Sequence, residues 1–324
     1  MTLRDLPRNL GLLLLVTIAA AGCGSDDPAT PARPITGYAF DRAWGGTGSG
    51  AGQFAFHDGP AAAGVAVDAA GTVYVADWGN HRVQVFTATG EFVRTFGTNG
   101  TANGQLFFPI GIAVGPGGDV FVAEAGNHRV QRFSATGAWE ATWGGSGAAN
   151  GQFANPNGIA VTAGGQVYVA DTFNHRIQQF DLDGNHVRTW GGQGTADGQF
   201  NLAYGVAVSP DGDVCVTDCA NHRLQLFTAT GTHLASYGQF GTGDAEFNGP
   251  IGIAFDGDGN AFVTDLNNHR VQEFGESGYL RQWGVFGVGN GQFHGPYGVA
   301  VDGSYNVYVA DAYNNRIQKF RPVR

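Results

Sequence analysis

The sequence predicts an all-β fold, a six-bladed β-propeller, from three observations. The tripeptide Asn-His-Arg recurs at intervals of 47 residues, with a last interval of 46. Short runs of β-forming residues bounded by glycine-containing turns stand in place of helical apolar spacing. The 324 residues include 54 glycines, which suits many tight turns. A period near 47 is typical of propeller blades. The tripeptide begins at Asn80, Asn127, Asn174, Asn221 and Asn268, with Asn314-Asn315-Arg316 as a sixth variant.

Each unit reads as four short antiparallel strands. In residues 158–190 these are Gly-Ile-Ala-Val, Val-Tyr-Val-Ala-Asp, Ile-Gln-Gln-Phe and His-Val-Arg-Thr-Trp-Gly, separated by turns and by the Asn-His-Arg corner. One such sheet cannot bury both of its faces. Six of them are therefore expected to stack radially around a central channel.

The two ends of the repeat region predict how the ring closes. A segment resembling an outer strand, Tyr38 to Gly45, precedes the first inner strand, and the chain stops just after a third strand at residues 316–320. We expect the N-terminal segment to supply the outermost strand of the last blade, which leaves no open sheet edge between first and last units.

The chain resembles the NHL repeat family in its Asp-x-x-Asn-His-Arg corners and in its inner strands of the Gly-Ile-Ala-Val type. The resemblance covers residues 37–324. It implies a propeller that often serves as an interaction module, although related six-bladed propellers include amidating lyases and lactonases with a channel metal. The inner strands begin at Gly64, Gly111, Gly158, Gly205, Gly252 and Gly298.

The N-terminus is predicted to be an export signal. Residues 1–23 combine a basic start, an apolar stretch and small residues before Cys23, an ending that resembles a lipobox. Cys23 is the expected lipidation site, with ordinary cleavage to a soluble periplasmic form as the alternative. Residues 24–36 lack apolar periodicity and are expected to be a flexible tether. We thus expect an exported, membrane-anchored lipoprotein that faces the periplasm or the cell surface.

Charge limits the expected partners. The formal net charge is -10, so nucleic acid is not expected as a partner, and membrane contact is expected only through the lipid anchor. We expect a monomer. Cys215 and Cys219 are four residues apart, about 13 Å along a strand, which favours free thiols over a disulfide.

The repeated corner residues are interpreted as structural. A catalytic constellation is needed once, whereas the histidines occupy the same place in five blades. We expect the corner carboxylate to cap the turn and bind the arginine, and the asparagine to adopt the backbone conformation that β-branched residues avoid. The turns at Asp181 and Asp256 resemble calcium loops but are expected to be hairpin turns.

Candidate binding residues are those that differ between blades. The residue before each inner-strand glycine should ring the channel mouth, either as a binding surface or as packing: Ile110, Asn157, Tyr204, Ile251 and Tyr297, with Ala63 in the first blade. Large loop-tip side chains suggest a contact surface on the same face: Trp78, Phe173 and Tyr313. His57, in an inserted segment beside Asp58, is a candidate base or ligand.

We predict a noncatalytic cell-envelope scaffold that binds a protein, peptide or glycan with its loop face. The alternative is a metal-dependent lyase or hydrolase, similar to the amidating lyases or lactonases, with its site at the channel. The channel-mouth positions hold no histidine or carboxylate, which favours the scaffold. We predict no catalytic residue, metal ligand or cofactor; calcium or zinc would be the ion of the alternative.

Overall fold

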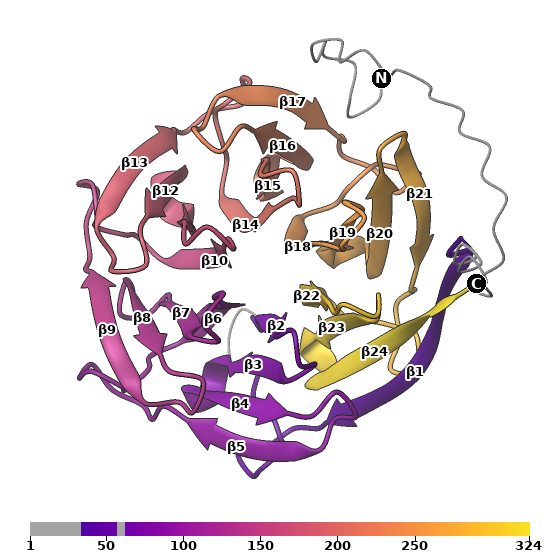
Figure 1. Ribbon diagram of the computed structural model, residues 1–324. Helices are drawn as coiled ribbons and strands as arrows, with labels where there is room; N and C mark the ends of the chain where they lie inside the picture. Colours follow the sequence, from indigo (N-terminus) through magenta and orange to yellow (C-terminus); the bar gives the residue numbers. More distant parts are fainter. Residues whose placement is uncertain (1–33, 57–61) are drawn as a thin grey trace, which may run out of the picture.

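The computed structural model describes residues 34–56 and 62–324, and within them six four-stranded antiparallel sheets form a ring (Figure 1). The prediction of a six-bladed β-propeller is confirmed. Blades 1 to 5 are each a run of four consecutive strands, ordered from the channel outward. The part of the chain that the structure describes contains no helix with the length and hydrophobicity of a membrane span.

The strands of blades 1 to 3 have similar lengths except at the channel, where β2 has 3 residues and β6 and β10 each have 6. Blade 1 consists of β2 (Val65–Val67), β3 (Val73–Asp77), β4 (Arg82–Phe86) and β5 (Phe92–Phe96). Blade 2 consists of β6 (Pro109–Val114), β7 (Val120–Glu124), β8 (Arg129–Phe133) and β9 (Trp139–Gly144). Blade 3 consists of β10 (Pro156–Val161), β11 (Val167–Asp171), β12 (Arg176–Phe180) and β13 (His186–Gly191).

Blades 4 to 6 continue the series. Blade 4 consists of β14 (Ala203–Val208), β15 (Val214–Asp218), β16 (Arg223–Phe227) and β17 (His233–Tyr237). Blade 5 consists of β18 (Pro250–Phe255), β19 (Ala261–Asp265), β20 (Arg270–Gly275) and β21 (Gly278–Trp283). Blade 6 consists of β22 (Pro296–Val301), β23 (Val307–Asp311), β24 (Arg316–Val323) and β1 (Gly37–Gly45).

The N-terminal strand closes the ring as predicted. β1 pairs antiparallel with β24, from Gly37 opposite Val323 to Gly45 opposite Arg316, and Figure 1 shows the indigo β1 beside the yellow β24. The last sheet therefore joins the first and last strands of the propeller, so that unfolding of blade 6 must separate them.

The antiparallel order gives the ring two different faces. One carries the connections between blades and the corners between the second and third strands, and we call it the loop face. Five corners contain a short 3₁₀ turn: η1 (Trp78–Asn80), η2 (Thr172–Asn174), η3 (Cys219–Asn221), η4 (Leu266–Asn268) and η5 (Ala312–Asn314). The opposite, hairpin face carries the other turns and the paired ends Gly37 and Val323.

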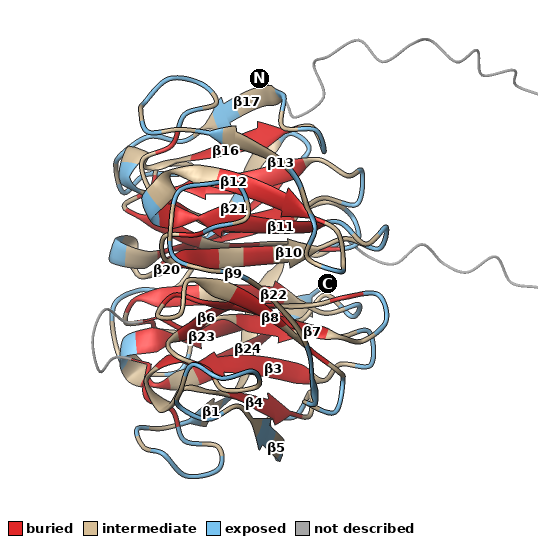
Figure 2. Ribbon diagram, turned by 90° about the vertical axis from the view of Figure 1, so that its left-hand side faces the viewer, coloured by how far each residue is buried: buried red, intermediate tan, exposed pale blue. Residues whose placement is uncertain are grey.

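The hydrophobic core lies between the blades. Figure 2 shows buried residues concentrated in the strands and exposed residues in the loops of the two faces. In blade 3, Tyr168 of the second strand packs edge-on against Trp190 of the outer strand, with ring centroids 6.0 Å apart. Both rings contribute to the cluster shared with blade 4. Each sheet thus buries its faces only against its neighbours, which explains why the repeats need a ring.

Candidate functional site

The corner carboxylate of each blade is the centre of a buried polar network. Asp77 has no exposed surface, and its Oδ2 accepts hydrogen bonds from Asn80, Arg82 and Gln84 at 2.8 to 3.0 Å. Its Oδ1 accepts from the backbone N–H of Ala55 at 2.9 Å. The carboxylate binds the corner arginine as predicted, but it does not cap the 3₁₀ turn, because its Oδ1 accepts from the incoming connection and not from an N–H of the turn.

The corner arginine and glutamine hold the connection that precedes each inner strand. Arg82 donates to the carbonyl oxygens of Ser49, Gly50 and Gln53 at 2.8 to 2.9 Å. Gln84 donates to Gln53 and accepts from the N–H of Gly52. The glutamine recurs two residues after every corner arginine, a part of the network that the sequence analysis did not single out.

The corner histidines join each blade to the next. His81 accepts a hydrogen bond through Nδ1 from the N–H of Phe108, in the connection to the following blade, at 3.1 Å. In the last blade Asn315 Oδ1 replaces the imidazole and accepts from Phe56 at 2.7 Å. The remaining pairs are His128 with Asn155, His175 with Leu202, His222 with Gly249 and His269 with Gly295.

A second detail of the corner prediction was also wrong. The residue with left-handed backbone geometry is the histidine, at φ 55° in His81, and not the preceding asparagine. Asn80 instead ends the 3₁₀ turn and uses its amide to bind Asp77 and the carbonyl of Gly48. The left-handed turn aims the imidazole at the next blade, and burial lowers the pKa of His81, which keeps Nδ1 able to accept.

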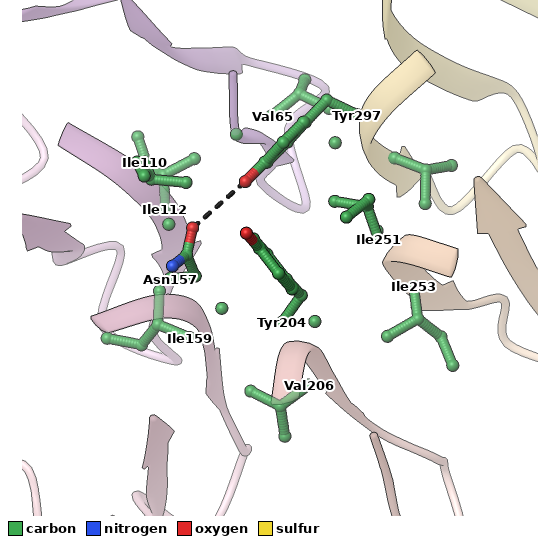
Figure 3. Close-up of a pocket in the computed structure, with 17 residues that line it drawn as sticks. Val65, Ile110, Ile112, Asn157, Ile159, Tyr204, Val206, Ile251, Ile253 and Tyr297 are labelled. Carbon is green, nitrogen blue, oxygen red and sulfur yellow. Dashed lines mark hydrogen bonds between the residues drawn. The ribbon is translucent and has the colours of Figure 1, made fainter. Parts of the chain in front are cut away.

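The predicted channel-mouth residues do come together. Asn157, Tyr204 and Tyr297 face one another across the central axis, with Ile110 and Ile251 beside them (Figure 3). They line a cavity of about 80 Å³ together with the glycines and branched residues of the inner strands. Four of the five are buried, and Tyr204 is partly exposed.

The polar groups of the channel mouth are largely paired with one another. Tyr297 donates its hydroxyl to Asn157 Oδ1 at 3.1 Å, the bond drawn in Figure 3. Asn157 Nδ2 donates to Thr172 Oγ1 at 3.0 Å and to the carbonyl of Asn155 at 3.1 Å. Burial raises the pKa of Tyr297 well above its usual value and that of Tyr204 as well, so both hydroxyls are neutral at pH 7.

The inner-strand glycines set the width of the channel. A Cβ atom on Gly111 would lie 1.9 Å from the carbonyl oxygen of Asn157, and one on Gly205 would lie 2.2 Å from that of Ile251. Only glycine lets neighbouring inner strands approach so closely. The channel is consequently narrow, and a cavity of this volume holds a few water molecules rather than a sugar or a peptide side chain.

The described part of the channel lining does not offer the ligands that a catalytic metal needs. Its described lining residues carry no carboxylate, imidazole or thiol, and Asn157 is the one amide. In residues 34–56 and 62–324, no group of three or more His, Cys, Asp or Glu residues is placed to hold a metal ion. The turns at Asp181 and Asp256 are hairpin turns in which Oδ1 accepts two backbone N–H groups.

The predicted loop-tip residues differ in exposure. Phe173 is 56% exposed and Tyr313 is 41% exposed, and Tyr313 stacks on His294 with ring centroids 4.7 Å apart. Trp78 is only 7% exposed because its ring stacks on Phe108 at 4.3 Å, so it offers little contact surface. His57 and Cys23 lie outside the described residues. Cys215 and Cys219 are both free thiols.

The most exposed aromatic side chains of the loop face are two that the sequence analysis missed. Phe240 and Phe286 are 65% and 64% exposed, and both follow an outer strand. The four equivalent residues are polar: Thr47, Asn99, Ser146 and Gln193. Alignment of the six connections would have shown this difference in the sequence. In every connection this residue lies seven positions before the residue with which it forms an isolated β-bridge.

These aromatics belong to a set of exposed apolar side chains on the connections before and after blade 5 and on the corner of blade 6. Phe286 lies 4.9 Å from the ring of His269 and 5.0 Å from that of His294, and Phe240 lies 5.0 Å from His222. Val285 and Val288 beside Phe286 are 60% and 75% exposed. We define the apolar patch as Phe240, Val285, Phe286, Val288 and Tyr313.

Comparisons with known proteins agree with this architecture. NHL repeats match at residues 62–86, 108–133, 153–180, 200–227, 247–274 and 293–320, which is about half of the chain. No curated protein sequence matches the chain.

Several solved structures share the fold at low sequence identity. A gluconolactonase from Xanthomonas campestris is 16% identical with a TM-score of 0.62, covering 90% of this chain and 99% of that one. Virginiamycin B lyase from Staphylococcus aureus is 14% identical with a TM-score of 0.56, covering 80% and 94%. A chain of a nidogen/laminin complex is 17% identical with a TM-score of 0.54, covering 68% and 78%. These similarities establish the fold alone.

Proposed function

Because the chain belongs to the NHL repeat family, and because its corner histidines and carboxylates are used within the fold, we propose that it is a noncatalytic binding scaffold. Its loop face binds a protein partner, and peptides or glycans are the other ligands that such a face accommodates. The observation that carries the proposal is the apolar patch. Exposed aromatic and branched side chains on neighbouring loops of one face are typical of a protein contact surface.

The placement of the patch suits an exported, tethered protein. Residues 24–36 would connect the lipidated Cys23 to β1, and β1 begins on the hairpin face, where Gly37 pairs with Val323. An anchor that joins the domain on the hairpin face does not obstruct the loop face. The patch is then accessible to a partner in the periplasm or at the cell surface.

The enzyme alternative has less support from the site. Two proteins of similar fold are a lyase and a gluconolactonase, but the narrow channel of this chain lacks metal-binding side chains among its described residues. Elemental analysis of the purified protein tests this alternative directly. A stoichiometric calcium or zinc ion whose removal abolishes a hydrolytic or lyase activity would overturn the scaffold proposal.

A double substitution in the patch tests the scaffold proposal. Phe240→Gln with Phe286→Ser introduces the side chains that Gln193 and Ser146 already supply at equivalent positions. Since both rings are mostly exposed, we expect stability to change by less than about 0.5 kcal/mol each. Partners cross-linked in envelope preparations should fall at least about tenfold, as expected when contact residues of an interface are removed.

The matched control is Val187→Thr, which alters a half-exposed residue of the outer strand β13, away from the loop face. This variant should recover the same partners as the wild type, quantified by mass spectrometry. Equal recovery by the double variant and the control would show that the patch does not mediate binding.

A further inference from the structure

A hollow between blades 4 and 5 opens on the hairpin face, away from both the channel and the apolar patch. Its volume is about 410 Å³, within the range of small-molecule sites. Tyr237 and Phe255 line its sides with aromatic rings. Its floor consists of buried apolar side chains: Cys215, Leu224, Leu226, Ala261 and Phe274. We call this hollow the blade 4–5 pocket.

One cross-strand pair of blade 4 is uncharged, in contrast to its equivalents. Leu226, in the pocket floor, lies opposite Ala235 in the pairing of β16 with β17. Both side chains contribute to the apolar cluster shared with blade 5. The equivalent pair contains at least one charged residue in each of the other five blades: Val85 with Arg94, Arg132 with Ala141, Gln179 with Arg188, Glu273 with Arg281 and Lys319 with Arg42. Among the six blades, blade 4 therefore presents an apolar surface where the others present a charge.

The second strand of blade 4 continues this apolar surface. Cys215 lies opposite Leu226. The burial of Cys215 raises its pKa to about 12, so its thiol is neutral at pH 7 and contributes apolar surface. The equivalent residue is aromatic in the other five blades: Tyr74, Phe121, Tyr168, Phe262 and Tyr308. The wall from blade 4 is thus both smaller and free of charge.

Blade 5 departs from the repeat on the facing wall. Ala261 lies opposite Phe255, whereas the equivalent pair is two valines in each of the other five blades. The small Ala261 belongs to the floor of the pocket, and the ring of Phe255 forms one of its sides. Both walls therefore depart from the repeat at the interface where the pocket lies.

The carboxylates at the entrance have partners within the protein. Asp211, Asp213 and Glu276 all interact with other residues of the chain. Asp258 accepts a hydrogen bond from the hydroxyl of Tyr305 at 3.0 Å. A charged ligand would have to compete for these carboxylates, whereas an uncharged ligand leaves them paired.

We propose that the blade 4–5 pocket binds a neutral apolar molecule, such as an aliphatic chain with an uncharged polar end. The chain lies against Cys215, Leu226 and Phe274, and burial of apolar surface drives its binding. The rings of Tyr237 and Phe255 enclose it from the sides. This site is separate from the apolar patch, so binding here does not depend on the scaffold role proposed above.

Three probes of the same chain length test the class of ligand by isothermal titration calorimetry on the folded protein. Octanol should bind, and octanoate and octylammonium should each bind at least about tenfold more weakly, because a charged head loses hydration at an entrance whose carboxylates are already paired. If either charged probe binds as tightly as octanol, or if no probe binds, the proposal is overturned.

Three variants locate the binding. Cys215→Phe should abolish binding of octanol, because it places in the pocket a ring of the kind that the other blades contain. Leu226→Gln nearly keeps the size of the side chain but introduces the amide that Gln179 has in blade 3, and it should weaken octanol at least about tenfold. Asp258→Asn keeps an oxygen that accepts from Tyr305 and should leave octanol binding unchanged.

Cys219→Ser, at a cysteine that does not line the pocket, is the control and should bind octanol like the wild type. Circular dichroism checks the fold of each variant. Full binding of octanol by either Cys215→Phe or Leu226→Gln in its folded state would place the ligand elsewhere and overturn the proposal.

Discussion

The interfaces on either side of blade 4 are built on the same frame but filled differently. Between blades 3 and 4, Tyr168 packs against Trp190, and Trp190 packs against Phe227 at 6.0 Å. Between blades 4 and 5, the corresponding residues are Cys215 and Tyr237, and the space beside Cys215 is part of a pocket of about 410 Å³. Between blades 3 and 4, Tyr168 instead forms part of the wall of a hollow of about 790 Å³ on the hairpin face. The two residues that make this difference, Cys215 and Tyr237, both belong to the repeat that forms blade 4.

Both interfaces nevertheless keep the same link on the loop face. His175 accepts from Leu202 at 3.0 Å between blades 3 and 4, and His222 accepts from Gly249 at 3.2 Å between blades 4 and 5. Each blade therefore supplies a hydrogen-bond acceptor that joins it to the next blade. The ring can stay closed while the volume between neighbouring sheets varies. Replacement of one ring can thus change the packing at an interface without loss of closure.

The largest expected effect comes from removing the aromatic ring of Tyr168 between blades 3 and 4. Tyr168→Cys deletes a buried aromatic side chain and its hydroxyl bond to the carbonyl of Ala229. We expect the free energy of unfolding to fall by about 3–5 kcal/mol, as for other large-to-small changes of aromatic core residues. Urea denaturation measures this. A loss below about 1 kcal/mol would mean that Tyr168 does not support its interface.

The reverse change at the open interface should have a smaller effect of opposite sign. Cys215→Phe fills an existing hollow, so we expect a gain of about 0.5–2 kcal/mol, as for other cavity-filling substitutions. Cys219→Ser serves as the control for loss of a thiol. Destabilisation by Cys215→Phe would show that the pocket walls cannot accept the ring that the other blades contain.

Periodicity was sufficient to predict the fold. Six copies in constant phase indicated the blade number, and the position of Tyr38 to Gly45 relative to the first inner strand indicated the closure. The same phase placed Asn157, Tyr204 and Tyr297 at one ring of positions, and the structure brings them together. These predictions depend on the alternation of residue types along single strands and on the order of the strands. Both can be read from short stretches of the sequence.

Contacts between neighbouring blades could not be predicted from the periodicity of the sequence. The histidine link pairs His81 with Phe108, and its geometry depends on the left-handed turn and on the spacing of two sheets. The burial of Trp78 also depends on the next blade, through Phe108. The substitution at Cys215 was visible in the repeats, but the pocket that it opens depends on the packing of blade 4 against blade 5.

The smallest predicted effect concerns pH and the histidine links. Burial lowers the pKa of His81 below its usual 6.5, so the unfolded chain takes up a proton first as the pH falls, and the stability of the folded state decreases below about pH 6.5. His81→Asn copies the closing link, where Asn315 accepts without titrating. Between pH 7 and pH 5, the wild type should therefore lose more stability than the variant, by up to about 1 kcal/mol, the contribution of one hydrogen bond. Urea denaturation at both pH values measures the difference, and equal losses would show that His81 does not contribute to acid sensitivity.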